Sequence, residues 1–281
     1  MRAAYIVDLV MRPEFRGMSA LLRLMNGMRN LHEFFDFVFV TPSASGMPVI
    51  ESFLRIPARF DLTAKVVPLR PVKVASQFFR RRNRPLLSLV DVGFRSAALA
   101  GFAIAEAVGS LKIDESWPPA AELEAFLLTG SRGHVAGQRD SAFLDWRFRQ
   151  SPDFKYQLFF LRRRGQLVGY VATRRAVYNG YFACFIIDAF GLESLKASDW
   201  KTVAWALIAR EVSPGGADFL MILGNTACGP LAALARSPFI SVPKRFLPQR
   251  TTLFADWWDG ARPFDFAENS FQVTLADCDM F

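Results

Sequence analysis

Two patterns of hydrophobic positions alternate along the first quarter of the chain. The runs AAYIVDLVM and FDFVFV are apolar apart from one acidic residue each, which is typical of strands buried on both faces of a sheet. Between them, Leu21, Leu24, Met25 and Met28 recur at the spacing of one helix face. SGMPVIESFLRI predicts a second helix, and DLTAKVVPLRP predicts an edge strand because its prolines cannot donate to a ladder. We therefore expect strand, helix, strand, helix, strand over residues 1–72.

The second half repeats this alternation with more elements. AAELEAFLLTG and RDSAFLDWRFRQSP predict two helices, and FKYQLFFLRRRGQLVGYVATRRA predicts an antiparallel hairpin that turns at Arg164 and Gly165. YFACFIIDAFG and ADFLMILGN predict further strands. SDWKTVAWALIAREV predicts a helix with Val203, Ala204 and Leu207 inward, GPLAALARSPF a short helix, and VPKRFLPQRTTLFADW the last strands. The predicted order is helix, helix, strand, strand, strand, helix, strand, helix, strand.

Residues 74–121 separate the two halves and break the alternation. They hold a basic run from Arg80 to Arg84, an Ala-rich helical stretch, and a Trp-Pro-Pro sequence that marks their end. This composition predicts a linker with one or two helices. We expect four consecutive segments: a first module over 1–72, a helical linker over 73–119, a second module over 120–260 and a tail over 261–281.

The composition is that of a folded protein with a large core. Of the 281 residues, 52% are hydrophobic and 28 are Phe, which excludes a disordered chain. The net charge of +8 suits a nucleotide cofactor, a nucleic acid or an anionic membrane surface, and does not choose among them. The run from Arg80 to Arg84 is either a solvated basic loop or a patch that contacts anionic lipid or nucleic acid. No specific nucleic acid is expected.

The cysteines, histidines and apolar runs bear on compartment and metal chemistry. The three cysteines are far apart and form no pairing pattern, which favours a reducing compartment. No signal peptide is visible, and no apolar stretch approaches the roughly 20 residues of a membrane span, so we expect a cytoplasmic protein. His32 and His134 stand alone, and the group Asp277, Cys278 and Asp279 is expected to be a solvated tail. No metal is predicted.

The turn between the first strand and the first helix has the composition of an anion site. A pyrophosphate needs convergent donors, and the first turn of a helix offers free N–H groups and a partial positive charge. Small residues let phosphates approach the backbone. The strand end and turn comprise Val10, Met11, Arg16, Gly17, Met18, Ser19 and Ala20. The alternative is an ordinary strand-to-helix turn.

Several segments resemble the GNAT acyltransferase family, and in particular tandem bacterial proteins in which two modules follow one another. VMRPEFRGMSALLRLM is similar to the family's cofactor segment, a strand followed by an Arg/Gln-x-x-Gly-x-Gly/Ala turn and a helix. RDSAFLDWRFRQSPDFKYQLFFLRRRGQLVGYVATRR and NTACGPLAALARSPF resemble the front and back of a second module. The resemblance covers nearly the whole chain. It implies an α/β (α+β) fold with two GNAT-like modules, each a mixed, mostly antiparallel sheet flanked by helices.

The chain departs from the family pattern in three places. The family places two helices and three strands before its cofactor segment, and only the last strand is present, so we expect the first module to lack its N-terminal half. Ser19 stands where the motif has its first Gly, and Leu21 where it has Gly or Ala. The second module lacks this turn, and Asp199 at its helix start would compete with a phosphate for N–H groups. We expect that module to be a structural or acceptor-binding half.

The function that the resemblance implies is N-acyl transfer from acetyl-CoA or another acyl-CoA to a small-molecule amine. Because such tandem proteins are often associated with polysaccharide assembly, an amino sugar or a cell-envelope precursor is an expected acceptor. Asp8 is either a base with a raised pKa or a buried carboxylate bonded to backbone. Ser43 is either a catalytic candidate or a turn residue. Asp188 parallels Asp8 in the second module, which suggests a shared structural role. The alternative function is a catalytically inactive GNAT-fold binding or scaffold protein.

Overall fold

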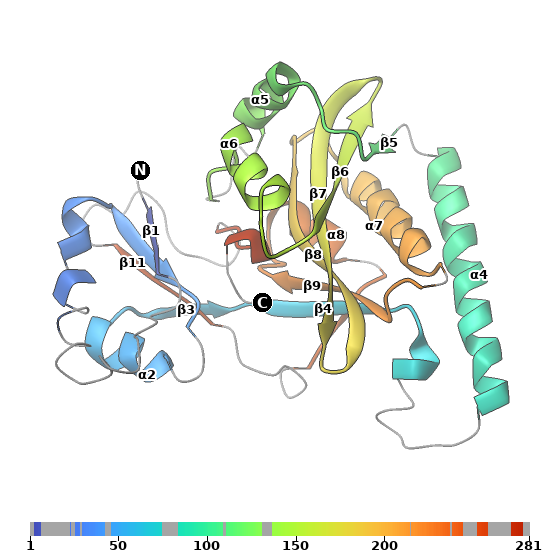
Figure 1. Cartoon of the computed structure of the whole chain (residues 1–281), viewed down its shortest axis with the longest axis horizontal. Helices are drawn as coiled ribbons and strands as arrows, with labels where there is room; N and C mark the ends of the chain where they lie inside the picture. Colours follow the sequence, from blue (N-terminus) through green and yellow to red (C-terminus); the bar gives the residue numbers. More distant parts are fainter. Residues whose placement is uncertain are drawn as a thin grey trace. The chain divides into compact units, whose positions relative to one another are not determined.

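The computed structural model describes residues 3–6, 23, 26–28, 30–42, 46–74, 84–108, 111–130, 137–213, 215–236, 238–243, 252–257 and 271–277. The chain divides into two compact units (Figure 1). Unit 1 comprises Met1–Leu62, Pro243–Phe271 and Cys278–Phe281, and unit 2 comprises Thr63–Val242 and Gln272–Asp277. Neither unit is one continuous segment. This division differs from the consecutive segments expected from the sequence, because residues 63–68 pair within the sheet of unit 2 and residues 252–257 pair within the sheet of unit 1.

Unit 1 contains a four-stranded sheet in the order β1-β2-β11-β3. Strand β1 (Ala3–Ile6) runs parallel to β2 (Phe37–Val40). Strand β11 (Thr252–Trp257), from near the end of the chain, lies antiparallel between β2 and β3 (Ala58–Asp61). The described helical turns include η2 (Asn30–Glu33), α2 (Met47–Val49) and the π-helix η3 (Ile50–Leu54), and residues 23 and 26–28 are also helical. The small core of unit 1 contains Val38, Val40, Ile50, Ile56 and Phe254.

Unit 2 contains a seven-stranded mixed sheet in the order β10-β4-β9-β8-β7-β6-β5. The strands are β4 (Thr63–Pro68), β5 (Leu111–Asp114), β6 (Tyr156–Arg163), β7 (Gln166–Tyr178), β8 (Tyr181–Gly191), β9 (Phe219–Gly224) and β10 (Ile240–Ser241). Neighbouring strands are antiparallel except β8 and β9, which are parallel. The mixed, mostly antiparallel sheet agrees with the expected fold class.

The hairpin between β6 and β7 turns where the sequence predicted. Arg164 and Gly165 adopt φ values of 51° and 83°, and two consecutive left-handed residues form the tight turn that suits the twist of a hairpin. Glycine at the second position avoids the steric cost of that conformation. The turn therefore fixes the register of β6 against β7.

Helices cover the sheet of unit 2. They are α4 (Arg84–Val108), α5 (Ala120–Thr129), α6 (Ser141–Leu144), the π-helix η4 (Asp145–Arg149), α7 (Ala197–Glu211), α8 (Gly229–Leu234) and the short η6 (Leu275–Asp277). Val203, Ala204 and Leu207 of α7 are buried, as predicted. They belong to the core cluster that also contains Val171 and Ile186 of the sheet. No helix in the described ranges has both the length and the apolar character needed to cross a membrane.

The segment interpreted as a linker is part of unit 2. Helix α4 packs along α7, and Gly101 lies so close to Trp205 that an added Cβ would be 3.2 Å from the indole ring. Strand β5 pairs with β6 at the edge of the sheet. Strand β5 was not predicted from the sequence, because a strand of four residues, two of them charged, gives no clear periodic signal.

Candidate functional site

The residues predicted to form the cofactor and catalytic site lie outside the described residues. They are Asp8, Val10, Met11, Arg16, Gly17, Met18, Ser19, Ala20 and Ser43. Residues 80–83 of the basic run also lie outside them, and Arg84 begins α4. These assignments stay predictions. The strand-to-helix connection of unit 2, where strand β8 leads into helix α7, does lie within the described residues. It corresponds to the predicted cofactor turn of unit 1.

Strands β8 and β9 pair over only part of their length. Ala183 to Ile186 pair with Phe219 to Ile222, whereas β8 continues to Gly191. Opposite β7, Ala172 pairs with Asp188 and Thr173 with Ile186, so Ile187 is the extra residue of a β-bulge, which bends a strand and re-aims its side chains. Beyond Ile186 and Ile222 the two strands no longer pair, and we call this stretch the β8–β9 gap.

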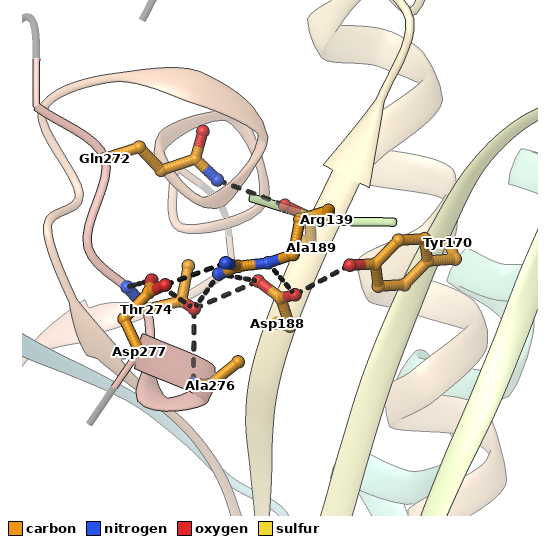
Figure 2. Close-up of polar contacts among 8 residues, drawn as sticks. All are labelled: Arg139, Tyr170, Asp188, Ala189, Gln272, Thr274, Ala276 and Asp277. Atoms are coloured by element: carbon orange, nitrogen blue, oxygen red, sulfur yellow. Dashed lines mark hydrogen bonds and ion pairs between the residues drawn. The ribbon is translucent and has the colours of Figure 1, made fainter. Parts of the chain in front are cut away.

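A segment from near the end of the chain lies in the β8–β9 gap. Asn225, just after β9, donates its backbone N–H to the carbonyl of Val273 at 2.8 Å. On the β8 side, the Gln272 side-chain amide donates to the carbonyl of Ala189 at 3.2 Å (Figure 2). The approach to β9 is close, since a Cβ at Gly224 would be 2.6 Å from the Val273 carbonyl oxygen. Residues 272–277, called the C-terminal strap below, therefore bridge the ends of both strands.

A buried ionic network anchors this strap to β8. Arg139 donates from Nε to Asp188 Oδ2 at 2.8 Å, and its Nη1 lies 2.8 Å from Asp277 Oδ1. Tyr170 donates its hydroxyl to Asp188 Oδ2 at 2.7 Å. The Thr274 hydroxyl lies 3.0 Å from a carboxylate oxygen of each aspartate and, having one proton, donates to one of them at a time. Figure 2 shows the guanidinium of Arg139 between the two carboxylates.

The electrostatic environment of the network keeps Arg139 and Tyr170 protonated. Burial by itself lowers the pKa of Arg139, but the carboxylates of Asp188 and Asp277 raise this pKa well above its ordinary value. Burial, and then the charge of Asp188, raise the pKa of Tyr170 well above its ordinary value. Arg139 therefore stays charged and Tyr170 stays a donor. Because these polar groups are buried and bonded to one another, the network anchors the chain, which is the structural role expected for Asp188.

The start of helix α7 is already occupied by an internal carboxylate. Asp199 Oδ2 accepts from the Lys196 backbone N–H at 2.7 Å and lies 2.6 Å from Arg163 Nη2. A carboxylate in the first turn satisfies free N–H groups and the positive end of the helix dipole. Its negative charge would therefore compete with an external phosphate at this helix start.

Most members of the buried network were not predicted from the sequence. The expectation of a solvated tail is wrong for Asp277, whose side chain is only 7% exposed. Arg139 and Thr274 were not singled out, because Arg139 lies 49 residues from Asp188 and 135 residues from Thr274, and such separations leave no spacing signal. The apolar and small residues of VTLA, after Gln272, were the available hint of burial. Among the described residues, no group of three or more His, Cys, Asp or Glu is placed to hold a metal ion.

Comparison with solved structures identifies the fold. The chain superposes on a GCN5-related N-acetyltransferase from Anabaena variabilis with a TM-score of 0.53, 11% identity, and coverage of 92% of this chain and 55% of that one. It superposes on a probable N-acyltransferase from Enterococcus faecalis, a conserved protein of unknown function, with a TM-score of 0.56, 14% identity, and coverage of 92% and 54%. The chain thus has the GNAT fold, as the resemblance implied. It spans about half the length of these structures.

Sequence comparison adds nothing to this assignment. No protein-family model matches the chain, and no curated protein matches it in sequence. At identities of 11% and 14% the structural likeness establishes the fold alone, since one fold hosts many functions.

Proposed function

We propose that the chain is an N-acyltransferase that moves an acetyl or other acyl group from acyl-CoA to an amine. The observation that carries this proposal is the GNAT fold, which covers 92% of the chain and is shared with a solved N-acetyltransferase. In the reaction, the neutral amine nitrogen attacks the thioester carbonyl. A C–N bond forms, the C–S bond breaks, and the departing thiolate takes up a proton while the amine loses one.

The cofactor site of this proposal lies in unit 1. The turn Arg16, Gly17, Met18, Ser19 and Ala20, after the strand end at Val10 and Met11, would bind the diphosphate of coenzyme A through backbone N–H groups. Its assignment to unit 1 is supported by unit 2, where Asp199 occupies the matching helix start and the C-terminal strap occupies the β8–β9 gap. Asp8 and Ser43 remain the candidates for proton transfer.

The acceptor and location belong to the same proposal. A small-molecule amine such as an amino sugar or an envelope precursor is the proposed acceptor, on the strength of the family resemblance. The isolated cysteines, two of which are buried in unit 2, favour a cytoplasmic location. The basic run from Arg80 to Arg84 is proposed to contact an anionic membrane surface. No metal takes part in the proposed reaction.

A thermal-shift titration with acetyl-CoA tests the proposal. A ligand that binds only the native state stabilises it by about 2.7 kcal/mol at 100 times its Kd, so the melting temperature should rise with acetyl-CoA concentration. Arg16→Ala should weaken this rise. Arg23→Ala removes an exposed arginine from the helix that follows and should leave the rise unchanged. Absence of any rise in the unaltered chain would contradict the proposal.

A second candidate function is a GNAT-fold binding or scaffold protein without catalysis. It is favoured by the internal occupation of unit 2 at both Asp199 and the gap between β8 and β9. Ser19 and Leu21, where the family motif has small residues, are also compatible with it. Measurement of free coenzyme A distinguishes the two functions. An acyltransferase releases it from acetyl-CoA in the presence of an amine acceptor, whereas a binding protein consumes no acetyl-CoA with any amine.

A further inference from the structure

The C-terminal strap makes the contacts that an extended, amide-bearing ligand would make. The carbonyl of Val273 accepts from the backbone N–H of Asn225 at the β9 side. The side-chain amide of Gln272 donates to the carbonyl of Ala189 at the β8 side. Val273 and Thr274 are each 1% exposed, so no space remains for a second chain between these groups. The strap thus supplies one amide donor to β8 and one carbonyl acceptor to the residue that follows β9.

The far end of the strap is fixed by charge. Asp277 is paired with the buried Arg139 and also accepts from the backbone N–H of Thr274 at 2.9 Å. Arg139 pairs in addition with Asp188 on β8 (Figure 2). If the strap left, Arg139 would keep Asp188 as its partner, so the network has one charge pair that is independent of the strap. Departure of the strap therefore leaves the ion pair of Arg139 and Asp188 intact.

We propose that residues 272–277 act as an intramolecular occupant that closes the β8–β9 gap of unit 2 against coenzyme A. The pantetheine arm of coenzyme A is an extended chain with two amide groups, so it would compete for the same N–H of Asn225 and carbonyl of Ala189. Asp199 closes the adjoining helix start against the diphosphate. The inference rests on the proposed function and deepens it: a chain with two GNAT-like modules takes up one coenzyme A, in unit 1.

The test compares three full-length proteins and one matched control by isothermal titration with coenzyme A. The first is the unaltered chain. The second carries Asp199→Ser, which opens the start of α7 and leaves the strap anchored. The third carries Asp199→Ser together with Gln272→Gly, Thr274→Gly and Asp277→Asn, which remove the side-chain anchors of the strap. The matched control is Asp199→Ser with Asp153→Asn, which removes one carboxylate from an exposed position outside the network. Hydrogen exchange over 271–277 and a cooperative melt verify that the strap is released and that unit 2 is folded.

We expect one coenzyme A per chain for the unaltered protein, for Asp199→Ser and for the matched control, and two for the released variant. Two sites in Asp199→Ser would overturn the proposal, and so would a single site in a released variant whose strap exchanges freely. If the unaltered chain binds none and the released variant binds one, the strap closes the gap but the proposed function of unit 1 fails. If none of the proteins binds, both proposals fail.

In the unaltered chain, hydrogen exchange gives an independent check that needs no substitution. The amide of Asn225 is protected by Val273 and the amide of Thr274 by Asp277, and coenzyme A bound in unit 1 should not accelerate the exchange of either. Exchange at these two amides that accelerates in proportion to coenzyme A occupancy would mean that the ligand displaces the strap from the β8–β9 gap, and would overturn the proposal.

Discussion

Arg139 and Asp188 form a buried ion pair, with Nε 2.8 Å from Oδ2 and side chains that are 3% and 1% exposed. The residues are 49 positions apart in the sequence. Arg139 precedes helix α6, and Asp188 follows the bulge of strand β8. The pair therefore ties the loop before α6 to the end of β8, and Asp277 attaches the strap to the same guanidinium.

Replacing Arg139 by Met should destabilise unit 2 strongly. The substitution keeps an apolar stem but leaves the carboxylates of Asp188 and Asp277 buried without their cation, and breaking one side of a buried pair costs about 3–5 kcal/mol. Urea unfolding monitored by circular dichroism measures the loss. Arg149→Met is the control, because its pair with Asp145 is 65% and 34% exposed and such pairs contribute about 1 kcal/mol or less. Equal losses for the two variants would contradict this account of the network.

Stability at alkaline pH should depend on Tyr170. Burial raises the pKa of Tyr170 above its value of about 10 in an unfolded chain. The folded state therefore holds this proton more tightly than the unfolded state does. The resulting stabilisation is fully present below pH ~10 and is lost as the pH rises toward the folded-state pKa, with a slope of up to about 1.4 kcal/mol per pH unit.

Tyr170→Phe removes this titration and the hydrogen bond to Asp188. We expect the variant to be less stable at neutral pH by about 1.5–3 kcal/mol, the range for hydrogen bonds to charged groups. Its free energy of unfolding should also fall less steeply than that of the unaltered chain above pH ~10. Denaturant titrations at a series of pH values measure both effects. Parallel pH profiles would show that Tyr170 titrates normally.

Asp218 should contribute more to stability than the lysine that pairs with it. Asp218 is fully buried, and it accepts from the backbone N–H of Phe182 at 2.9 Å and from Lys73 at 2.6 Å. Asp218→Ala leaves the Phe182 N–H without this acceptor, and we expect a loss of about 3 kcal/mol or more. Lys73→Met removes a half-exposed side chain but leaves Asp218 with the Phe182 N–H and with Arg70 at 3.7 Å, so a smaller loss of about 1–2 kcal/mol is expected. If Lys73→Met lowered the melting temperature more than Asp218→Ala does, this account of Asp218 would be contradicted.

Two glycines of α4 should respond to substitution in opposite directions. Gly101 lies against Trp205 of α7, whereas an added Cβ at Gly93 would meet no atom within 4 Å. Gly93→Ala should stabilise the protein by about 0.5–1 kcal/mol, the helix propensity difference. Gly101→Val should destabilise it by about 1–3 kcal/mol through overpacking. Melting temperatures of the two variants measure both effects, and a neutral Gly101→Val would mean that α4 does not pack closely on α7.

The local elements of unit 2 were predictable because their signals are local. The hairpin at Arg164 and Gly165 follows from turn chemistry. The inward face of α7 follows from the spacing of Val203 and Leu207. Neither prediction requires knowledge of a distant partner, and both are confirmed.

The exchange of strands between the units was not predictable in the same way. Strand β4 was expected in the first module and pairs with β9 in unit 2, while β11 follows the second half in sequence and lies between β2 and β3 in unit 1. Periodicity shows that a segment is a strand but not which sheet it joins. The network of Arg139, Asp188 and Asp277 escaped for a related reason, since a charged residue is expected at the surface until its partner is known.

The measurement that tests the central claim most directly is calorimetric titration of the full-length chain with acetyl-CoA. The account predicts saturable binding of one molecule per chain, weakened at least tenfold by Arg16→Ala and unaffected by Arg23→Ala. A folded chain that gives no binding heat at any temperature tested, or whose binding is indifferent to Arg16, would contradict the claim that the turn near Gly17 binds an acyl-CoA.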